Sequence, residues 1–280
     1  MIERRRYNIA EGLMEDRVWR TDILPLLETL PTNVIGLWEF SFSEMLNNAI
    51  DHSGGSVVDV TVSESEENTE ILVKDNGIGI FKKIQQSMNL LDERHAVLEL
   101  SKGKLTTDPT SHSGQGIFFT SRLVDSFHIL SGEAAFTRDA ATDEHWLFSL
   151  EQPTCGTAVF MKLNNHVSRT CEDVCRQYSS LDGFDFTKTV VPVRLALYGE
   201  EGLVSRSQAK RVVARVDLFQ SVVFDFEGLN SIGRSFADQM FRVFPAAHPQ
   251  ISIRVANATD EIRRQIAGTG FAILDEDEAS

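Results

Sequence analysis

The sequence is poor in cysteine and has no long apolar run, and each shortage excludes a class of protein. Three cysteines in 280 residues are too few for a disulfide framework, and a chain of this length can bury a sizeable core without one. No stretch approaches the ~18 apolar residues that a membrane span requires. We therefore expect a cytoplasmic protein with no membrane partner.

Basic residues are also scarce, which argues against nucleic acid as a partner. Lys and Arg total 27 against 41 Asp and Glu, for a net charge of −14. Residues 1–165 hold 14 basic and 25 acidic residues, so −11 of that charge lies in the first part. Affinity for phosphate backbones is largely electrostatic. An anionic ligand of this part would need backbone amides, a helix dipole or a metal ion.

The cysteine spacing permits a metal site only in principle. Cys171 and Cys175 would lie one helical turn apart, with His166 nearby. Structural zinc normally takes four ligands in tighter pairs. Ordinary reduced thiols are expected.

The hydrophobic pattern predicts two α/β domains with a boundary near 165–187. We expect an N-terminal helical segment over 1–34, a first domain over 35–165 and a smaller domain over 188–274, in which strands and helices alternate as crossover connections require. In the first part the pattern predicts a helical section over about 16–52, a helical stretch over 81–113, a helix from about Gly116, and strands at 57–62, 70–74, 126–131, 145–150 and 157–163. In the second it predicts a strand or hairpin at 188–197, strands at 221–226 and 251–255, and helices near 209–216, 236–244 and 259–267.

The most informative segment is residues 42–52, Phe-Ser-Glu-Met-Leu-Asn-Asn-Ala-Ile-Asp-His. As a helix it places Phe42, Met45, Leu46, Ala49 and Ile50 on one apolar stripe and its polar side chains opposite. Such a polar face is often simply solvated. Asn, however, is a poor helix former, and a carboxylate one turn from a carboxamide can orient water and hold Mg2+.

Three glycine-containing turns follow in order. The strand at 70–74 ends in Asp75-Asn76-Gly77-Ile78-Gly79, and the loop 111–116, Ser-His-Ser-Gly-Gln-Gly, enters an apolar helix. Gly156-Thr157 then enters the last strand of the first domain. Alone, each is an ordinary turn signal, although a loop entering a helix offers free backbone N–H groups to an anion.

Together, Glu44-xxx-Asn48, Asp75-x-Gly77-x-Gly79, Gly114-x-Gly116 and Gly156-Thr157 resemble the ordered motifs of the GHKL ATPase superfamily, over about residues 35–163. This superfamily includes DNA gyrase, histidine kinases and anti-sigma-factor serine kinases. The resemblance implies a two-layer α/β sandwich (the Bergerat ATP-binding fold) that binds ATP with Mg2+. A P-loop is absent from the sequence.

The resemblance also implies roles for single residues. Glu44 would activate the attacking water or hydroxyl, and Asn48 would coordinate Mg2+. Asp75 would accept the exocyclic N–H of adenine, supported by Thr157. The implied pocket also contains Asn47, His52, Gly77, Gly79, Gly114, Gln115 and Gly116. Lys102 and Lys104 fall in the implied ATP lid, where each either reaches a phosphate or is simply solvated.

Differences between this sequence and other members of the family reduce the number of functions to be expected. Only about 35 residues precede the first motif, so histidine autokinase activity is not expected, and the remaining ~115 residues do not resemble a topoisomerase transducer domain. Residues 222–237 instead resemble a STAS-like domain, the fold of anti-sigma-factor antagonists. Ser235 lies where those antagonists are phosphorylated, or is merely an N-terminal helix residue. Gly233-Arg234 replaces the usual Asp-Ser before it.

Two functions follow from these resemblances. The first is an Mg2+-dependent ATP-binding regulator whose slow ATPase activity gates interdomain contacts or contacts with a protein partner or second copy. The second is a serine kinase of anti-sigma-factor type that acts on a STAS domain, its own included.

Overall fold

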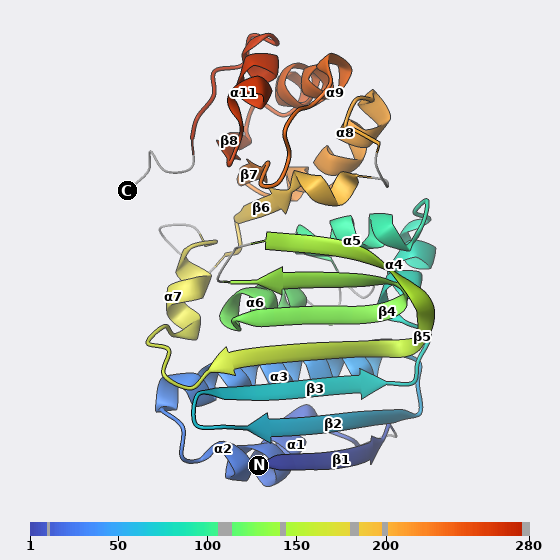
Figure 1. Cartoon of the computed structure of the whole chain (residues 1–280), viewed down its shortest axis with the longest axis vertical. Coiled ribbons are helices and arrows are strands. Elements are labelled where there is room, and N and C mark those ends of the chain that lie inside the picture. Colours follow the sequence, from blue (N-terminus) through green and yellow to red (C-terminus); the bar gives the residue numbers. More distant parts are fainter. Residues whose placement is uncertain (10–11, 106–113, 141–143, 180–184, 198–200, 276–280) are drawn as a thin grey trace. The chain divides into compact units, whose positions relative to one another are not determined.

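A computed structural model describes residues 1–9, 12–105, 114–140, 144–179, 185–197 and 201–275. The chain forms two compact units (Figure 1). The first comprises Met1–Val97 and Leu105–Cys175, and the second comprises Leu98–Lys104 and Arg176–Ser280. Residues 98–104, which lie within the predicted first domain (35–165), belong to the second unit. The predicted domain limits themselves stay a prediction.

The first unit is built on a five-stranded antiparallel sheet with the strand order β1-β2-β3-β5-β4. Its strands are β1 (Ile2–Asn8), β2 (Val57–Glu64), β3 (Asn68–Asp75), β4 (Ser126–Asp139) and β5 (Glu144–Asn164). Alternate residues of β2 and β3 are buried, as the period of two along a strand requires. Figure 1 shows α3 (Thr32–His52) and α6 (Gly116–Leu123) together on one face of this sheet. The predicted two-layer α/β sandwich is confirmed.

Helix α3 supplies much of the core of this unit. Its buried side chains recur every three or four residues, from Val34 to Ala49. Of the predicted stripe only Ile50 is half-buried, whereas the other members are buried. Further helices of the unit are α1 (Glu15–Val18), the π-helical turn η1 (Trp19–Ile23), α2 (Leu24–Leu27), α4 (Ile80–Met88) and α5 (Glu93–Ser101), of which the last continues into the second unit.

Two strands differ from the expected pattern. The segment predicted to be helical over 1–34 begins with β1, which pairs with β2 and whose Arg6 forms an ion pair with Asp59 at 2.6 Å. Its run of arginines has no alternation to reveal a strand, but charged side chains suit the exposed edge of a sheet. The predicted strands 145–150 and 157–163 form one strand, β5, because β4 pairs with it along its length around an irregularity at Ser131–Ala134.

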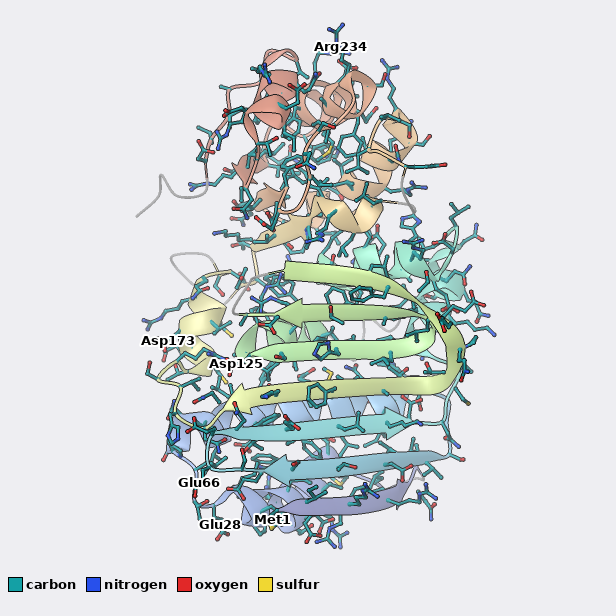
Figure 2. The ribbon with its side chains drawn as sticks, viewed as in Figure 1. Met1, Glu28, Glu66, Asp125, Asp173 and Arg234 are labelled. Atoms are coloured by element: carbon teal, nitrogen blue, oxygen red, sulfur yellow. The ribbon has the colours of Figure 1, made fainter. Side chains whose placement is uncertain are left out.

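The chain after β5 is bound to the first unit as far as α7 (Cys171–Arg176). Arg169 donates to Asp125 Oδ1 at 2.6 Å and to the carbonyl of Leu123, and Asp173 accepts from the backbone of Thr170 at 2.8 Å. Figure 2 labels Asp125 and Asp173 at this end of the sheet. These contacts order the exit of the chain from the first unit.

The second unit has a parallel sheet of β6 (Lys188–Pro192), β7 (Ser221–Asp225) and β8 (Ser252–Ala256), in that order. The connections are helical, as parallel pairing demands. They are η2 (Val193–Ala196), α8 (Arg206–Val213), η3 (Val216–Leu218), α9 (Arg234–Asp238), η4 (Gln239–Val243) and α10 (Phe244–Ala247), and α11 (Asp260–Ala267) follows β8. The predicted α/β domain is confirmed. The strand at Lys188 is not a hairpin, since Pro192 ends it and a 3-10 turn follows.

No helix in the part of the chain that the structure describes is long and apolar enough to cross a membrane. The three cysteines are free thiols. Burial, and to a lesser extent the neighbouring Cys175, raise the pKa of Cys171 to about 11. Across the described ranges no group of three or more His, Cys, Asp and Glu side chains is placed to hold a metal ion.

Candidate nucleotide site

Asp75 is the last residue of β3 and is only 5% exposed. Its Oδ1 accepts the backbone N–H of Gly77 at 2.7 Å and that of Thr157 at 3.2 Å. Burial raises the pKa of Asp75, while these hydrogen bonds and the hydroxyl of Thr157 oppose the rise. A buried carboxylate beside a turn is an acceptor for an uncharged N–H donor such as an exocyclic amine.

The pairing of β3 with β5 brings Thr157 to Asp75. Thr157 Oγ1 accepts the N–H of Ile80 at 2.9 Å, which joins β5 to the start of α4. Gly156 has φ +73°, and a Cβ there would lie 2.1 Å from the carbonyl oxygen of Asp75. Only glycine allows this close crossing of the two strands. Gly79 precedes α4, and Ser131 donates to the carbonyl of Gly156 at 3.1 Å.

Gly77 lies against the C-terminal end of α3. A Cβ at this position would be 2.2 Å from the carbonyl oxygen of Ser53, which accepts the N–H of Ile78 at 3.0 Å. Lys83 Nζ donates to the carbonyl of His52 at 2.7 Å, so a cation occupies the favourable end of the α3 dipole. Sequence reasoning missed Ser53, Lys83 and Ser131, because none belongs to a motif and only the fold places them here.

Helix α3 presents the remaining predicted polar residues beside α6. A Cβ on Gly116 would lie 1.9 Å from Glu44 Oε2, so the first residue of α6 lies directly against this carboxylate. Glu44, Asn47, Asn48 and His52 are all half-buried. The first N–H groups of a helix lack intrahelical partners and attract anions. A phosphate bound at the start of α6 would therefore lie near Glu44.

The loop before α6 is only partly described. Gly114 accepts the N–H of Leu105 at 3.1 Å, and Gln115 is the residue that precedes α6. Ser111, His112 and Ser113, the first residues of this predicted motif, lie outside the described residues.

The two lysines of the implied lid belong to the second unit. Lys102 is fully buried and paired with Glu99. Lys104 Nζ donates to the carbonyl of Leu218 at 2.8 Å and lies 4.7 Å from the ring centre of Phe219. The ammonium of Lys104 is thus engaged within the second unit, and its role toward phosphate stays a prediction.

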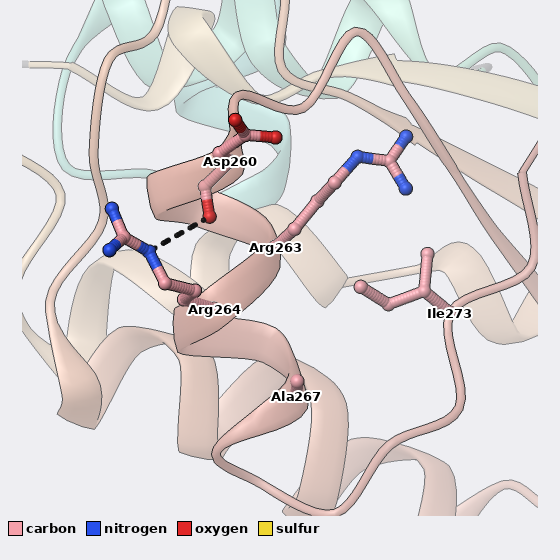
Figure 3. Close-up of a pocket in the computed structure, with 5 residues that line it drawn as sticks. All are labelled: Asp260, Arg263, Arg264, Ala267 and Ile273. Carbon is pink, nitrogen blue, oxygen red and sulfur yellow. Dashed lines mark hydrogen bonds between the residues drawn. The ribbon is translucent and has the colours of Figure 1, made fainter.

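A separate hollow lies on α11, within the second unit (Figure 3). It is lined by Asp260, Arg263, Arg264, Ala267 and Ile273. Arg263 pairs with Asp275 and Arg264 with Glu261. Because carboxylates already occupy both guanidinium groups, this hollow is a poor candidate for a phosphate site.

Two family models match the chain. Residues 39–164 match the family described as histidine kinase-, DNA gyrase B- and HSP90-like ATPase. Residues 208–263 match a STAS-like domain of unknown function (DUF4325). The curated proteins contain no significant match to the chain. The protein therefore contains a GHKL-type ATP-binding ATPase domain followed by a STAS-like domain.

Replacement of Asp75 by Asn should weaken ATP binding without lowering the stability of the fold. The carboxamide of Asp75→Asn would keep an acceptor for Gly77 and Thr157 but present an amide donor to adenine, at a cost of about 1–3 kcal/mol, or roughly 5- to 150-fold in ATP affinity by calorimetry. Since burial raises the native pKa of Asp75, its contribution to stability is present at low pH and lost as pH rises through that pKa. At pH 7 the uncharged variant should unfold at no lower temperature than wild type.

Glu70→Gln, on the same strand, is the control and should leave ATP affinity unchanged. Undiminished affinity in Asp75→Asn would remove Asp75 from the site.

Proposed function

We propose that the chain is an Mg2+-dependent ATP-binding regulator whose slow ATP hydrolysis gates contacts between its own parts or with a protein partner or second copy. The observation that carries this proposal is the contact of Glu44 with Gly116 at the start of α6. This contact supports a phosphate site at the start of α6 with the Glu44 carboxylate next to it. The buried acceptor Asp75, 5% exposed, supports recognition of the base.

In this proposal Glu44 is the general base. Its carboxylate takes a proton from water as the water oxygen attacks the terminal phosphorus, and the bond to the ADP oxygen breaks. The N–H groups at the start of α6 stabilise the charge that develops on the phosphate oxygens. The half-buried position of Glu44 beside these groups supports both roles.

The residues present fit an Mg2+ ion held jointly with a nucleotide. Asn48 lies one helical turn from Glu44 on α3 and is half-buried. With no larger acidic cluster in the described ranges, the ion would take its other ligands from phosphates and water, as Mg2+ commonly does. When bound, Mg2+ neutralises phosphate charge, which matters in a region as acidic as residues 1–165.

Glu44→Gln should bind ATP within a few-fold of wild type but hydrolyse it about 100-fold more slowly or worse, because a general base contributes roughly 10²–10⁴ in rate. Glu39→Gln is a matched control, since Glu39 is exposed on the same helix. The measurement is steady-state ADP release. If Glu44→Gln turns over as fast as wild type, Glu44 is not the base.

Removal of Mg2+ by EDTA should weaken ATP binding to the wild-type protein, because few basic side chains offset a triphosphate in this region. In Asn48→Ala the difference between affinities with and without Mg2+ should shrink. Calorimetry in both conditions measures it. Equal wild-type affinity in EDTA and in Mg2+ would contradict the metal's role.

A serine kinase is the second candidate, favoured by the position of Ser235. This residue is exposed in the first turn of α9, after Gly233. In that reaction Glu44 would accept the proton of a serine hydroxyl, whose oxygen attacks the terminal phosphorus to leave phosphoserine and ADP. The acceptor would be Ser235, in the same chain or a second copy, or a serine of another STAS domain.

Mass spectrometry after incubation with Mg-ATP distinguishes the candidates. We expect an unmodified chain and free phosphate, because Gly233-Arg234 departs from the antagonist pattern. Stoichiometric phosphate on Ser235 that disappears in Glu44→Gln would overturn this expectation in favour of the kinase.

A further inference from the structure

A short piece of the ATPase sequence is structurally part of the second unit. Residues 98–104 lie inside the span 39–164 that matches the ATPase family, yet they pack with Arg176–Ser280. The chain leaves the first unit after Val97 and returns to it at Leu105. We call residues 98–104 the anchor.

Lys102 is the centre of the anchor and is 0% exposed. Its ammonium donates to Glu99 Oε1 at 2.7 Å and to the carbonyls of Arg211 and Ala214, each at 2.8 Å. An ammonium has three N–H donors, and all three are used. The two carbonyls belong to the C-terminal end of α8, where the helix dipole favours a cation.

Further contacts hold the anchor on both sides of Lys102. Glu99 is 1% exposed and also pairs with Arg215 at 3.1 Å. Arg215 donates to the carbonyl of Lys104 at 2.6 Å, and Thr189 donates to the carbonyl of Lys102 at 2.7 Å. The anchor is therefore bound to β6, to the end of α8 and to the turn that follows it.

Withdrawal of the anchor would break several of these contacts at once. The carbonyls of Arg211 and Ala214 would lose the ammonium of Lys102, and Glu99 would lose its ion pair with Arg215. Separating members of a buried charged cluster is strongly unfavourable. When residues on either side of the anchor move, the anchor should stay with the second unit.

The chain links the anchor directly to the candidate phosphate position. Lys104 is followed by Leu105, whose N–H donates to the carbonyl of Gly114. Two residues later Gly116 begins α6 against Glu44. The peptide bond from Lys104 to Leu105 thus joins the anchor to a residue of the first unit that is hydrogen-bonded to Gly114, two residues before α6.

We propose that the anchor couples nucleotide occupancy at the Glu44–Gly116 site to the STAS-like unit, so that ATP changes the local stability of that unit. This proposal rests on the proposed ATP binding, and it assigns to the anchor the link between the ATP site and the STAS-like unit. Coupling between two sites is reciprocal. A ligand that binds and stabilises the STAS-like unit therefore changes ATP affinity by the same factor.

Hydrogen exchange on the full chain, with and without Mg-ATP, tests the coupling. In wild type, ATP should change the protection of amides in 186–197 and 206–219, around the anchor. In Lys102→Met this ATP-dependent change should be lost, while calorimetry still detects ATP binding. Lys210→Met is the matched control, since Lys210 is exposed on α8, and it should behave as wild type.

A second variant distinguishes loss of coupling from local unfolding that loss of the buried charge could cause in Lys102→Met. Thr189→Val removes only the hydrogen bond to the anchor's backbone and nearly conserves volume, and its ATP-dependent change should be smaller than that of wild type. If wild type binds ATP but protection of 186–197 and 206–219 does not respond, or if both variants respond as wild type does, the coupling is refuted while ATP binding stands. If wild type binds no ATP, the proposed function fails and the coupling fails with it.

Discussion

The antiparallel pairing of β3 with β5 is the constraint on which the candidate site depends. Lys74 lies opposite Ala158, so the next residue of β3, Asp75, meets Gly156 and Thr157 from 82 residues further along the chain. One carboxylate oxygen then holds two backbone N–H groups, from Gly77 and Thr157. A slip of one residue would turn Asp75 to the opposite face of the sheet. The register therefore determines whether the Asp75 carboxylate reaches Gly77 and Thr157 at all.

Helix α3 contacts both the turn that follows Asp75 and the start of α6. Its C-terminal end packs against the Gly77 turn through Ser53, and its middle places Glu44 against the start of α6. Because a helix is rigid over its length, the Gly77 turn and the start of α6 are held at a set separation. The glycines at 77 and 116 permit the two close approaches, since any Cβ would collide with Ser53 or Glu44.

Much of the fold was predictable from hydrophobic periodicity. The stripe of α3, the alternation in β2 and β3, and the helices α8 and α11 all follow from local pattern, because burial of one face is recorded in the spacing of apolar residues. The strand β1 was not predictable in this way. Its arginine-rich sequence gains its structure from pairing with β2, a partner about 55 residues away. Local pattern carries no record of such a pairing.

Residue type and spacing alone predict the chemistry of the candidate site: a carboxylate and carboxamides on one helix, an aspartate before a glycine turn, and a Gly-Thr entering a strand. Residue type and spacing can be read directly from the sequence. The positions of Lys102 and Lys104 depend on the tertiary fold, which places both in the second unit. A lysine side chain can be solvated, bind an anion or be buried against carbonyls. For Lys102 the outcome depends on the backbone carbonyls of Arg211 and Ala214, more than 100 residues further along the chain.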